Sequence, residues 1–245
     1  MSDEKCLSQD PIFNSTNRRR VLKNCIQRDR LSRYLATPAG SKSILIGSCA
    51  HSAFTNQARL FSDIDLINRY TDFSKDETAS RIEKETEFIT ARNIHFPEII
   101  ETVLPKRTSI DGPINIRTPN LEWHLASALL RLYRSISFSA VVHKESFDIW
   151  ALAQAQGLDM EKVQVAIDSL KTRNNFFSAN YTDTVCGILG FKEDSVFRFW
   201  DAGAVERPAF TSATPQKVFE TIKELTGKLD FKRNWKETRI TEKGF

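Results

Sequence analysis

Residues 44–67 read ILIGSCAHSAFTNQARLFSDIDLI, and this stretch decides the fold that we predict. Its first three residues form a short apolar run that ends at Gly47, a pattern typical of a buried strand. Residues 49–58 are compatible with a helix, and residues 61–67 return to the alternation of a strand. The stretch therefore predicts a strand, a glycine-serine turn, a helix and a return strand.

The return strand carries two aspartates, Asp63 and Asp65, which share one face because strand side chains alternate. Carboxylates about 7 Å apart along a strand repel each other unless a cation lies between them, and Mg²⁺ prefers such oxygen ligands. Gly47 lets the backbone approach a phosphate, and Ser48 with the amides of the next helix can hold phosphate oxygens. Each half alone is also common as solvated charge or as an ordinary turn. The two halves in this order predict a metal site beside a phosphate site.

These motifs resemble the core of the DNA polymerase β-like nucleotidyltransferase superfamily, h-G-[GS]…D-h-[DE]-h. The 14 residues between Ser48 and Asp63 are slightly more than is usual in that family. Residues 59–66, RLFSDIDL, further resemble the arginine, serine and D-I-D-L signature of AbiEii/AbiGii-type toxin nucleotidyltransferases. The resemblance implies a metal held by Asp63 and Asp65, and nucleotide contacts from Arg59 and Ser62.

A later part of the toxin pattern has a counterpart in residues 144–149, KESFDI. The resemblance implies that Lys144 contacts the nucleotide phosphates and that Asp148 orients or deprotonates the acceptor hydroxyl. The lysine that the family carries on the preceding helix falls on Ala128 here. Arg131, one turn further on, is a substitute, because a guanidinium also binds phosphate.

Several of these assignments have alternatives. Lys144 and Asp148 are spaced as an exposed ion pair on one helix face would be, and Arg131 with Arg134 fits a solvated helix face. His51 lies close enough to the turn to reach a phosphate. A third metal-binding carboxylate is expected on a later strand, with these residues in range: Glu98, Glu101 and Asp111.

Charge is unevenly distributed along the 245-residue chain, whose net charge is +4. Residues 17–34 hold seven Lys/Arg against one Asp, and residues 215–245 hold eight Lys/Arg against five Asp/Glu. Basic ends around an acidic centre suit a protein that meets a polyanion, although solvated helix faces would look the same. The four cysteines are widely spaced, which favours reduced thiols in a cytoplasm, and no apolar run predicts a membrane partner.

The predicted fold class is α+β, with a polymerase β-like nucleotidyltransferase core, a mixed β-sheet flanked by helices, and a helical C-terminal region. We divide the chain into a basic N-terminal helix (1–36), the α/β core (37–119) and a helical region (120–245). Residues 94–104 and 113–117 are expected to contain strands. The following ranges are expected to be helical: 19–35, 76–92, 120–136, 144–155, 159–171, 182–189 and 214–228. In the first of these helices one stripe is expected to be apolar, with the arginines on the other face: Val21, Leu22, Cys25, Ile26, Leu31 and Leu35.

The function that follows is Mg²⁺-dependent transfer of a nucleoside monophosphate from a nucleoside triphosphate to an acceptor hydroxyl. The basic ends and the toxin resemblance favour RNA, above all tRNA, as the acceptor. The resemblance also implies a toxin-like role opposed by a cognate antitoxin protein. A protein or small-molecule acceptor is an alternative. Another is a catalytically impaired binding or regulatory module, which Ala128 suggests.

Overall fold

The computed structural model describes residues 17–55, 59–61, 63–67, 86–89, 96–107, 112–137, 142–173, 200, 207 and 212–231. Contacts between residues divide the chain into two compact units. The first comprises residues 1–92, 98–120 and 202–212, and the second comprises residues 93–97, 121–201 and 213–245.

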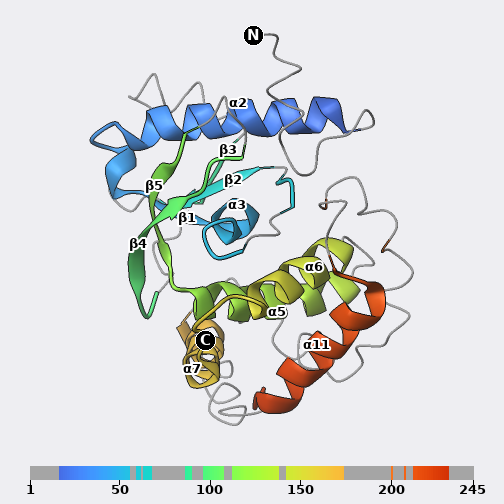
Figure 1. The fold of residues 1–245 in the computed structure, drawn as a ribbon. Coiled ribbons are helices and arrows are strands. Elements are labelled where there is room, and N and C mark those ends of the chain that lie inside the picture. The colour runs from blue at the N-terminus through green and yellow to red at the C-terminus, as the bar shows by residue number, and fades with distance from the viewer. Residues whose placement is uncertain are drawn as a thin grey trace. The chain divides into compact units, whose positions relative to one another are not determined.

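The first unit contains a mixed three-stranded sheet in the order β1-β2-β3 (Figure 1). Strand β1 (Ile44–Ile46) pairs antiparallel with β2 (Ile64–Ile67), so that Ile46 lies opposite Asp65. Strand β3 (Thr86–Ile89) pairs with β2 in the parallel direction. The short helix α3 (Gly47–His51) follows β1 directly and packs against both β1 and β2.

A second sheet in this unit is the antiparallel pair of β4 (Ile99–Leu104) and β5 (Ile114–Pro119). The Thr118 hydroxyl of β5 donates a 2.8 Å hydrogen bond to the Leu45 carbonyl of β1, which ties the two sheets together. A 3-10 turn, η1 (Gly40–Lys42), leads into β1.

Helix α2 (Arg18–Leu35) contacts β5 and supplies Leu31 and Tyr34 to the core of the first unit. That core is completed by apolar residues from every layer of the unit: Leu45, Cys49, Ala50, Phe61, Ile64, Leu66, Leu104, Ile114 and Ile116. Since Ile64 and Leu66 are buried there, the side of β2 opposite to them is left for the aspartates.

The second unit is helical in its described part and comprises α5 (Leu121–Ser137), α6 (Val142–Ala153), α7 (Met160–Arg173) and α11 (Pro215–Lys228). Helix α5 packs against α6 and α7, and α11 packs against α6. These helices bury many apolar side chains, among them Leu125, Leu129, Phe147, Trp150, Ile167 and Ile222.

Two helix starts in this unit follow from their capping residues. The Asp159 carboxylate accepts from the amides of Glu161 (2.9 Å) and Lys162 (3.3 Å), as expected of an N-cap. The Thr214 hydroxyl accepts from the amide of Lys217 at 3.2 Å, and Pro215 occupies the first helical position.

Most predicted elements are confirmed: helices near 19–35, 120–136, 144–155, 159–171 and 214–228, and strands within 94–104 and 113–117. Together they form a mixed arrangement of helices and sheets, in agreement with the predicted α+β class. The helix predicted for 182–189 lies outside the described residues. None of the described helices has the length and apolar character needed to cross a membrane.

Three predictions about these elements are wrong. Residues 86–89, expected to be helical, form strand β3. Backbone pairing with β2 outweighs the local helix preference of this charged segment. Leu22 and Ile26 were assigned to the buried stripe of α2 but are 40% and 42% exposed. Arg28, assigned to its solvent face, is completely buried.

Candidate functional site

The glycine turn and the aspartate strand are in direct contact. Gly47 has φ +71°, a conformation that residues with a side chain rarely adopt. A Cβ atom at this position would lie 2.1 Å from Oδ2 of Asp65 and 3.2 Å from its Cγ. Only glycine therefore allows the backbone between β1 and α3 to lie against this carboxylate. The two halves of the predicted motif, 18 positions apart in the sequence, meet at one point.

Asp63 and Asp65 lie at the beginning of β2. Asp63 is exposed and precedes the strand, whereas Asp65 is half-buried within it. Ile64 between them is 1% exposed, and Leu66 is fully buried. The alternation that the sequence predicts is thus present over residues 63–66, although the strand begins at Ile64 and not at Phe61.

Helix α2 holds the backbone just before Asp63. The Asn24 side chain donates from Nδ2 to the Phe61 carbonyl at 2.6 Å and accepts at Oδ1 from the Phe61 amide at 3.1 Å. Asn24 is 3% exposed, so these hydrogen bonds are shielded from water. The result is a rigid attachment two residues before the first aspartate.

Two arginines further secure this segment. Arg59, 7% exposed, donates from Nη1 to the Leu60 carbonyl at 2.9 Å. Arg107, which follows β4, donates to the Arg59 carbonyl at 3.4 Å. Arg59, predicted to contact the nucleotide, is therefore mostly buried, and its guanidinium bonds the local backbone.

Cys49 of α3 lies within electrostatic range of both aspartates and of two arginines. Burial is the main cause that raises the pKa of the Cys49 thiol to about 12. The charges of Arg28 and Arg107 lower it, while those of Asp65 and Asp63 raise it. Cys49 is consequently a neutral thiol at physiological pH.

Arg28 is a residue of this site that the sequence did not reveal. It is fully buried and donates from Nη2 to the Pro105 carbonyl at 2.7 Å. Position 28 lies among arginines that were all expected to be solvated. The available signal was its helical phase, since it falls one turn after Asn24 on the face that turns to the core.

The register of the sheet adds Glu87, which sequence reasoning also missed. Glu87 of β3 is the residue that pairs in register with Asp65 of β2. The sequence predicts the third carboxylate at later positions instead. Glu98 accepts a 3.1 Å hydrogen bond from Asn120, Glu101 pairs across the hairpin with Arg117, and Asp111 lies outside the described residues.

Glu101 and Arg117 also belong to a pocket of about 490 Å³ beside the β4–β5 hairpin. The pocket includes Ser43, which precedes β1, whereas Gly47 follows that strand. It therefore lies toward the opposite end of β1 from the aspartates, and we assign it no part in the predicted chemistry.

The remaining predicted residues near the turn differ in their surroundings. Ser48, second in α3, is half-buried and directly follows the glycine. His51 is 3% exposed, so its ring belongs to the interior of the first unit and not to its surface. Ser62 lies outside the described residues.

Lys144, Asp148 and Arg131 belong to the second unit. Asp148 of α6 is 4% exposed, which excludes an ion pair on an exposed helix face as its setting. Lys144, one turn earlier, and Arg131 of α5 are half-buried. Ala128, at the position of the family's lysine, is fully buried, so Arg131 is the nearest described cation further along α5.

The donor set at the first unit fits a magnesium ion. Mg²⁺ is commonly held by one or two carboxylates, with water and substrate phosphate completing its octahedron. Asp63 and Asp65 supply two carboxylates, one of them exposed. Among the side chains that the structure describes, no group of three or more His, Cys, Asp or Glu gathers in a way that could hold a metal. Asp63 and Asp65 can therefore supply two carboxylates to such an ion.

Neither the protein-family models, nor the curated proteins, nor the solved structures give a significant match to this chain.

Proposed function

We propose that this protein is a Mg²⁺-dependent nucleotidyltransferase with a polymerase β-like core of the AbiEii/AbiGii toxin type. The observation that carries the proposal is the contact of Gly47 with the Asp65 carboxylate. The antiparallel pairing of β1 with β2 sets Ile46 opposite Asp65, and the missing Cβ of Gly47 lets the carboxylate lie against the turn. A phosphate-binding turn and a metal-binding strand must meet, because the same triphosphate touches both.

In the proposed reaction an acceptor hydroxyl attacks the α-phosphorus of a nucleoside triphosphate. A bond forms between the acceptor oxygen and phosphorus, the bond to pyrophosphate breaks, and pyrophosphate leaves with the electron pair. Asp63 and Asp65 hold Mg²⁺, which supplies positive charge against the triphosphate. Gly47 leaves room for the Asp65 carboxylate beside the turn, and the Ser48 hydroxyl donates a hydrogen bond to a phosphate oxygen.

Residues of the second unit have roles in this proposal that come from the family resemblance. Lys144, with Arg131, balances the charge of the triphosphate. Asp148 accepts the proton of the acceptor hydroxyl as a general base. Arg59 and Ser62 stay predicted nucleotide contacts.

We propose RNA, with tRNA as the leading case, as the acceptor in the cytoplasm, and a toxin-like role with a cognate antitoxin. Helix α2, with seven Lys/Arg and one Asp among its 18 residues, supports a polyanionic acceptor. A protein or small-molecule acceptor does not require this surplus of positive charge.

The test is transfer of label from each α-labelled nucleoside triphosphate in the presence of Mg²⁺ and total RNA. We expect labelled RNA from the wild-type protein. Asp63→Asn and Asp65→Asn should each reduce transfer by at least about 100-fold, since even outer-shell changes at metal sites reach that size. Asp230→Asn, at an exposed position of the second unit, is the matched control and should retain activity.

No transfer to RNA, protein or small molecules by a folded wild-type protein would contradict the enzymatic proposal. That result would favour the binding or regulatory module, for which the buried Ala128 is the supporting observation. Transfer of label to a protein in place of RNA would agree with the proposed nucleotidyl transfer reaction but would contradict RNA as its acceptor.

The register of β3 extends the proposed metal site to Glu87. We expect Glu87→Gln to weaken Mn²⁺ binding, measured by electron paramagnetic resonance, by about 10-fold or more, because the register sets position 87 opposite Asp65 and the substitution removes an acidic residue there. Glu101→Gln, on the hairpin, should leave the affinity unchanged. Equal Mn²⁺ affinities for the Glu87→Gln and wild-type proteins would remove Glu87 from the site.

A further inference from the structure

The outward side of α2 carries a line of cations. Arg19, Lys23, Arg30 and Arg33 follow one another at helical spacings of four, seven and three residues, which places them on one side of the helix. Arg19, Lys23 and Arg33 are exposed, and Arg30 is half-buried. We call these four residues the α2 cationic face.

This face is fixed in its outward orientation. The opposite side of α2 is buried through Val21, Leu31 and Tyr34, which are at most 1% exposed. Asn24 and Arg28 on that side are bonded to the Phe61 and Pro105 carbonyls. The helix cannot rotate about its axis without breaking these contacts, so the cations are preorganised.

The charge on α2 is not balanced within the helix. Asp29 is its single acidic residue and pairs with Arg33, whose pKa it raises by a hydrogen bond and by its charge. Like charges one turn apart, such as Arg19 and Lys23, cost a few tenths of a kcal/mol in helix stability. Charge pairing within the helix therefore does not explain this sequence.

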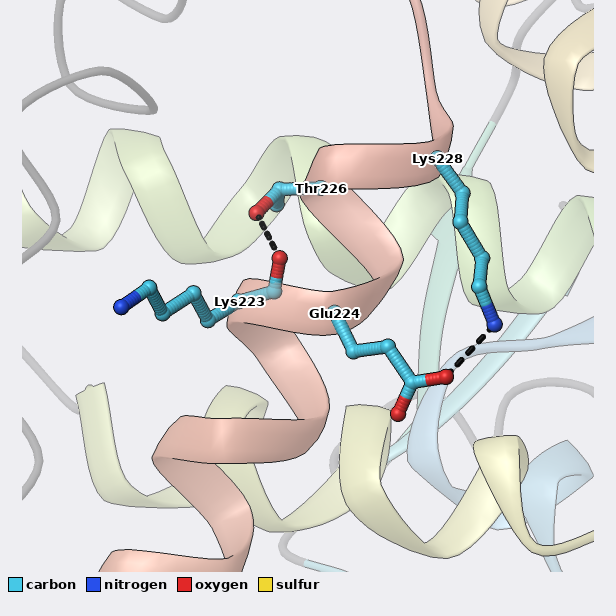
Figure 2. A network of polar contacts seen from close by, with 4 residues as sticks. All are labelled: Lys223, Glu224, Thr226 and Lys228. Carbon is cyan, nitrogen blue, oxygen red and sulfur yellow. Dashed lines mark hydrogen bonds and ion pairs between the residues drawn. The ribbon is translucent and has the colours of Figure 1, made fainter.

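Helix α11 has the mixed charges that are usual on a solvated helix, in contrast to α2. It has three lysines and two glutamates, and Lys228 forms an exposed ion pair with Glu224 at 2.5 Å (Figure 2). Figure 2 also shows the Lys223 side chain on the surface of the helix, with the Thr226 hydroxyl bonded to the Lys223 carbonyl at 3.0 Å. Mixed charges of this kind solvate a helix without creating a strong field.

We propose that the α2 cationic face binds the phosphate backbone of RNA. From Arg19 to Arg33 the face is about 21 Å long at the rise of an α-helix. Over that length a nucleic-acid duplex presents roughly a dozen phosphates. The identification of this RNA with the acceptor rests on the proposed function, whereas the binding itself does not.

An anionic membrane is the competing polyanion, and the structure argues against it. Helices that bind membrane surfaces insert a broad apolar side into the lipid. The apolar side of α2 is already part of the core of the first unit. Leu22 and Ile26, each about 40% exposed, remain between the cations and are too few to replace it.

The experiment measures the binding of a fluorescent RNA hairpin by anisotropy between 50 and 200 mM KCl, in the absence of nucleotide and Mg²⁺. The test variant is Arg19→Glu/Lys23→Glu, and the control is Lys217→Glu/Lys223→Glu on α11, where both lysines are exposed. Both variants change the net charge by the same amount. The glutamate at position 19 lies in the first turn of α2, where an acidic residue suits the helix dipole.

For the α2 variant we expect at least a tenfold loss of affinity and a slope of log K against log [KCl] that is shallower by about 2, or about 1 for each phosphate contact removed. The α11 variant should bind RNA like the wild type. Equal losses in the two variants would overturn the proposal, because net charge and not this face would then be responsible. Binding to phosphatidylserine vesicles that depends on Arg19 and Lys23, without a matching effect on RNA, would also overturn it.

The outcome is separable from that of the proposed function. Asp63→Asn should abolish nucleotide transfer and leave the RNA affinity unchanged, whereas Arg19→Glu/Lys23→Glu should leave the binding of Mn²⁺ unchanged. If the enzyme is active and its RNA affinity does not depend on α2, only the proposal that the α2 cationic face binds RNA is contradicted. If the protein binds RNA through α2 but transfers no nucleotide, only the proposed nucleotidyltransferase activity is contradicted.

Discussion

Gly47 connects β1 to α3 in a conformation that leaves no room for a side chain. Its φ of +71° alone disfavours other residues by about 1 kcal/mol. The Asp65 carboxylate further restricts which residue can occupy this position, because a Cβ would overlap it. A carboxylate at the end of a side chain can rotate away, so a substitution here should displace the predicted metal ligand more than it destabilises the fold.

We therefore expect Gly47→Ala to lose roughly 1–2 kcal/mol of unfolding free energy but to lose most of its Mn²⁺ affinity and transfer activity. Gly157→Ala is the matched control. Gly157 also has a positive φ, +80°, but a Cβ there would meet no atom within 4 Å. The Gly157→Ala protein should lose a similar amount of unfolding free energy, measured by urea denaturation, and should bind Mn²⁺ like the wild type. A Gly47→Ala protein that binds Mn²⁺ like the wild type would contradict the contact.

Cys49 predicts a pH dependence of stability. Its folded-state pKa, about 12, lies above the ordinary value near 9. Between these values the unfolded chain releases the thiol proton and the native protein keeps it, so stability falls as pH rises. Below pH 9 both states hold the proton, and the group has no effect. We expect the urea midpoint to fall between pH 9 and pH 10.5, and less steeply in Cys49→Ala. If the urea midpoint falls equally steeply with pH in the wild type and in Cys49→Ala, the raised pKa of Cys49 is not the cause.

At the scale of elements, α2 acts through its two sides. The inner side holds the segment before Asp63 through Asn24, and the outer side carries the cations. The short strand β2 needs this support, because four residues in a three-stranded sheet cannot by themselves fix the chain that precedes them.

Asn24→Ala should therefore impair the metal site beyond its effect on stability. The loss of two buried hydrogen bonds to Phe61 should cost about 2–4 kcal/mol and weaken Mn²⁺ binding through movement of Asp63. Gln164→Ala is the control, since Gln164 makes the same reciprocal pair with the Asp230 backbone (2.8 and 3.0 Å) in the second unit. Its metal affinity should remain that of the wild type, as calorimetric titration with Mn²⁺ would show. Intact Mn²⁺ affinity in a folded Asn24→Ala protein would argue against a positioning role.

At the scale of the whole molecule, the predicted site residues are divided between two units. Gly47, Asp63 and Asp65 belong to the first unit, and Lys144 and Asp148 to the second. The proposal assigns metal binding to the first unit alone. The contribution of the second unit should therefore be detectable in catalysis without a change in metal affinity.

Lys144→Ala should raise the KM for the nucleoside triphosphate by about 10-fold or more, as expected when a charge-assisted contact of about 1.5–3 kcal/mol is lost. Its Mn²⁺ affinity in the absence of nucleotide should stay unchanged. Lys162→Ala, an exposed lysine of α7, is the control. Steady-state kinetics of both variants would decide, and an unchanged KM would remove Lys144 from the proposed nucleotide site.

The sequence by itself determined the elements that rest on local signals. The strand before Gly47, the capped helices that begin after Asp159 and Thr214, and the alternation around Asp63 and Asp65 were all readable, because each depends on residues close in sequence. Only the tertiary structure decided which distant groups meet. It placed Arg28 in the interior, put Asn24 against Phe61, paired Glu87 with Asp65 and left Leu22 exposed. Burial and register depend on partners far along the chain, and no local pattern specifies those partners.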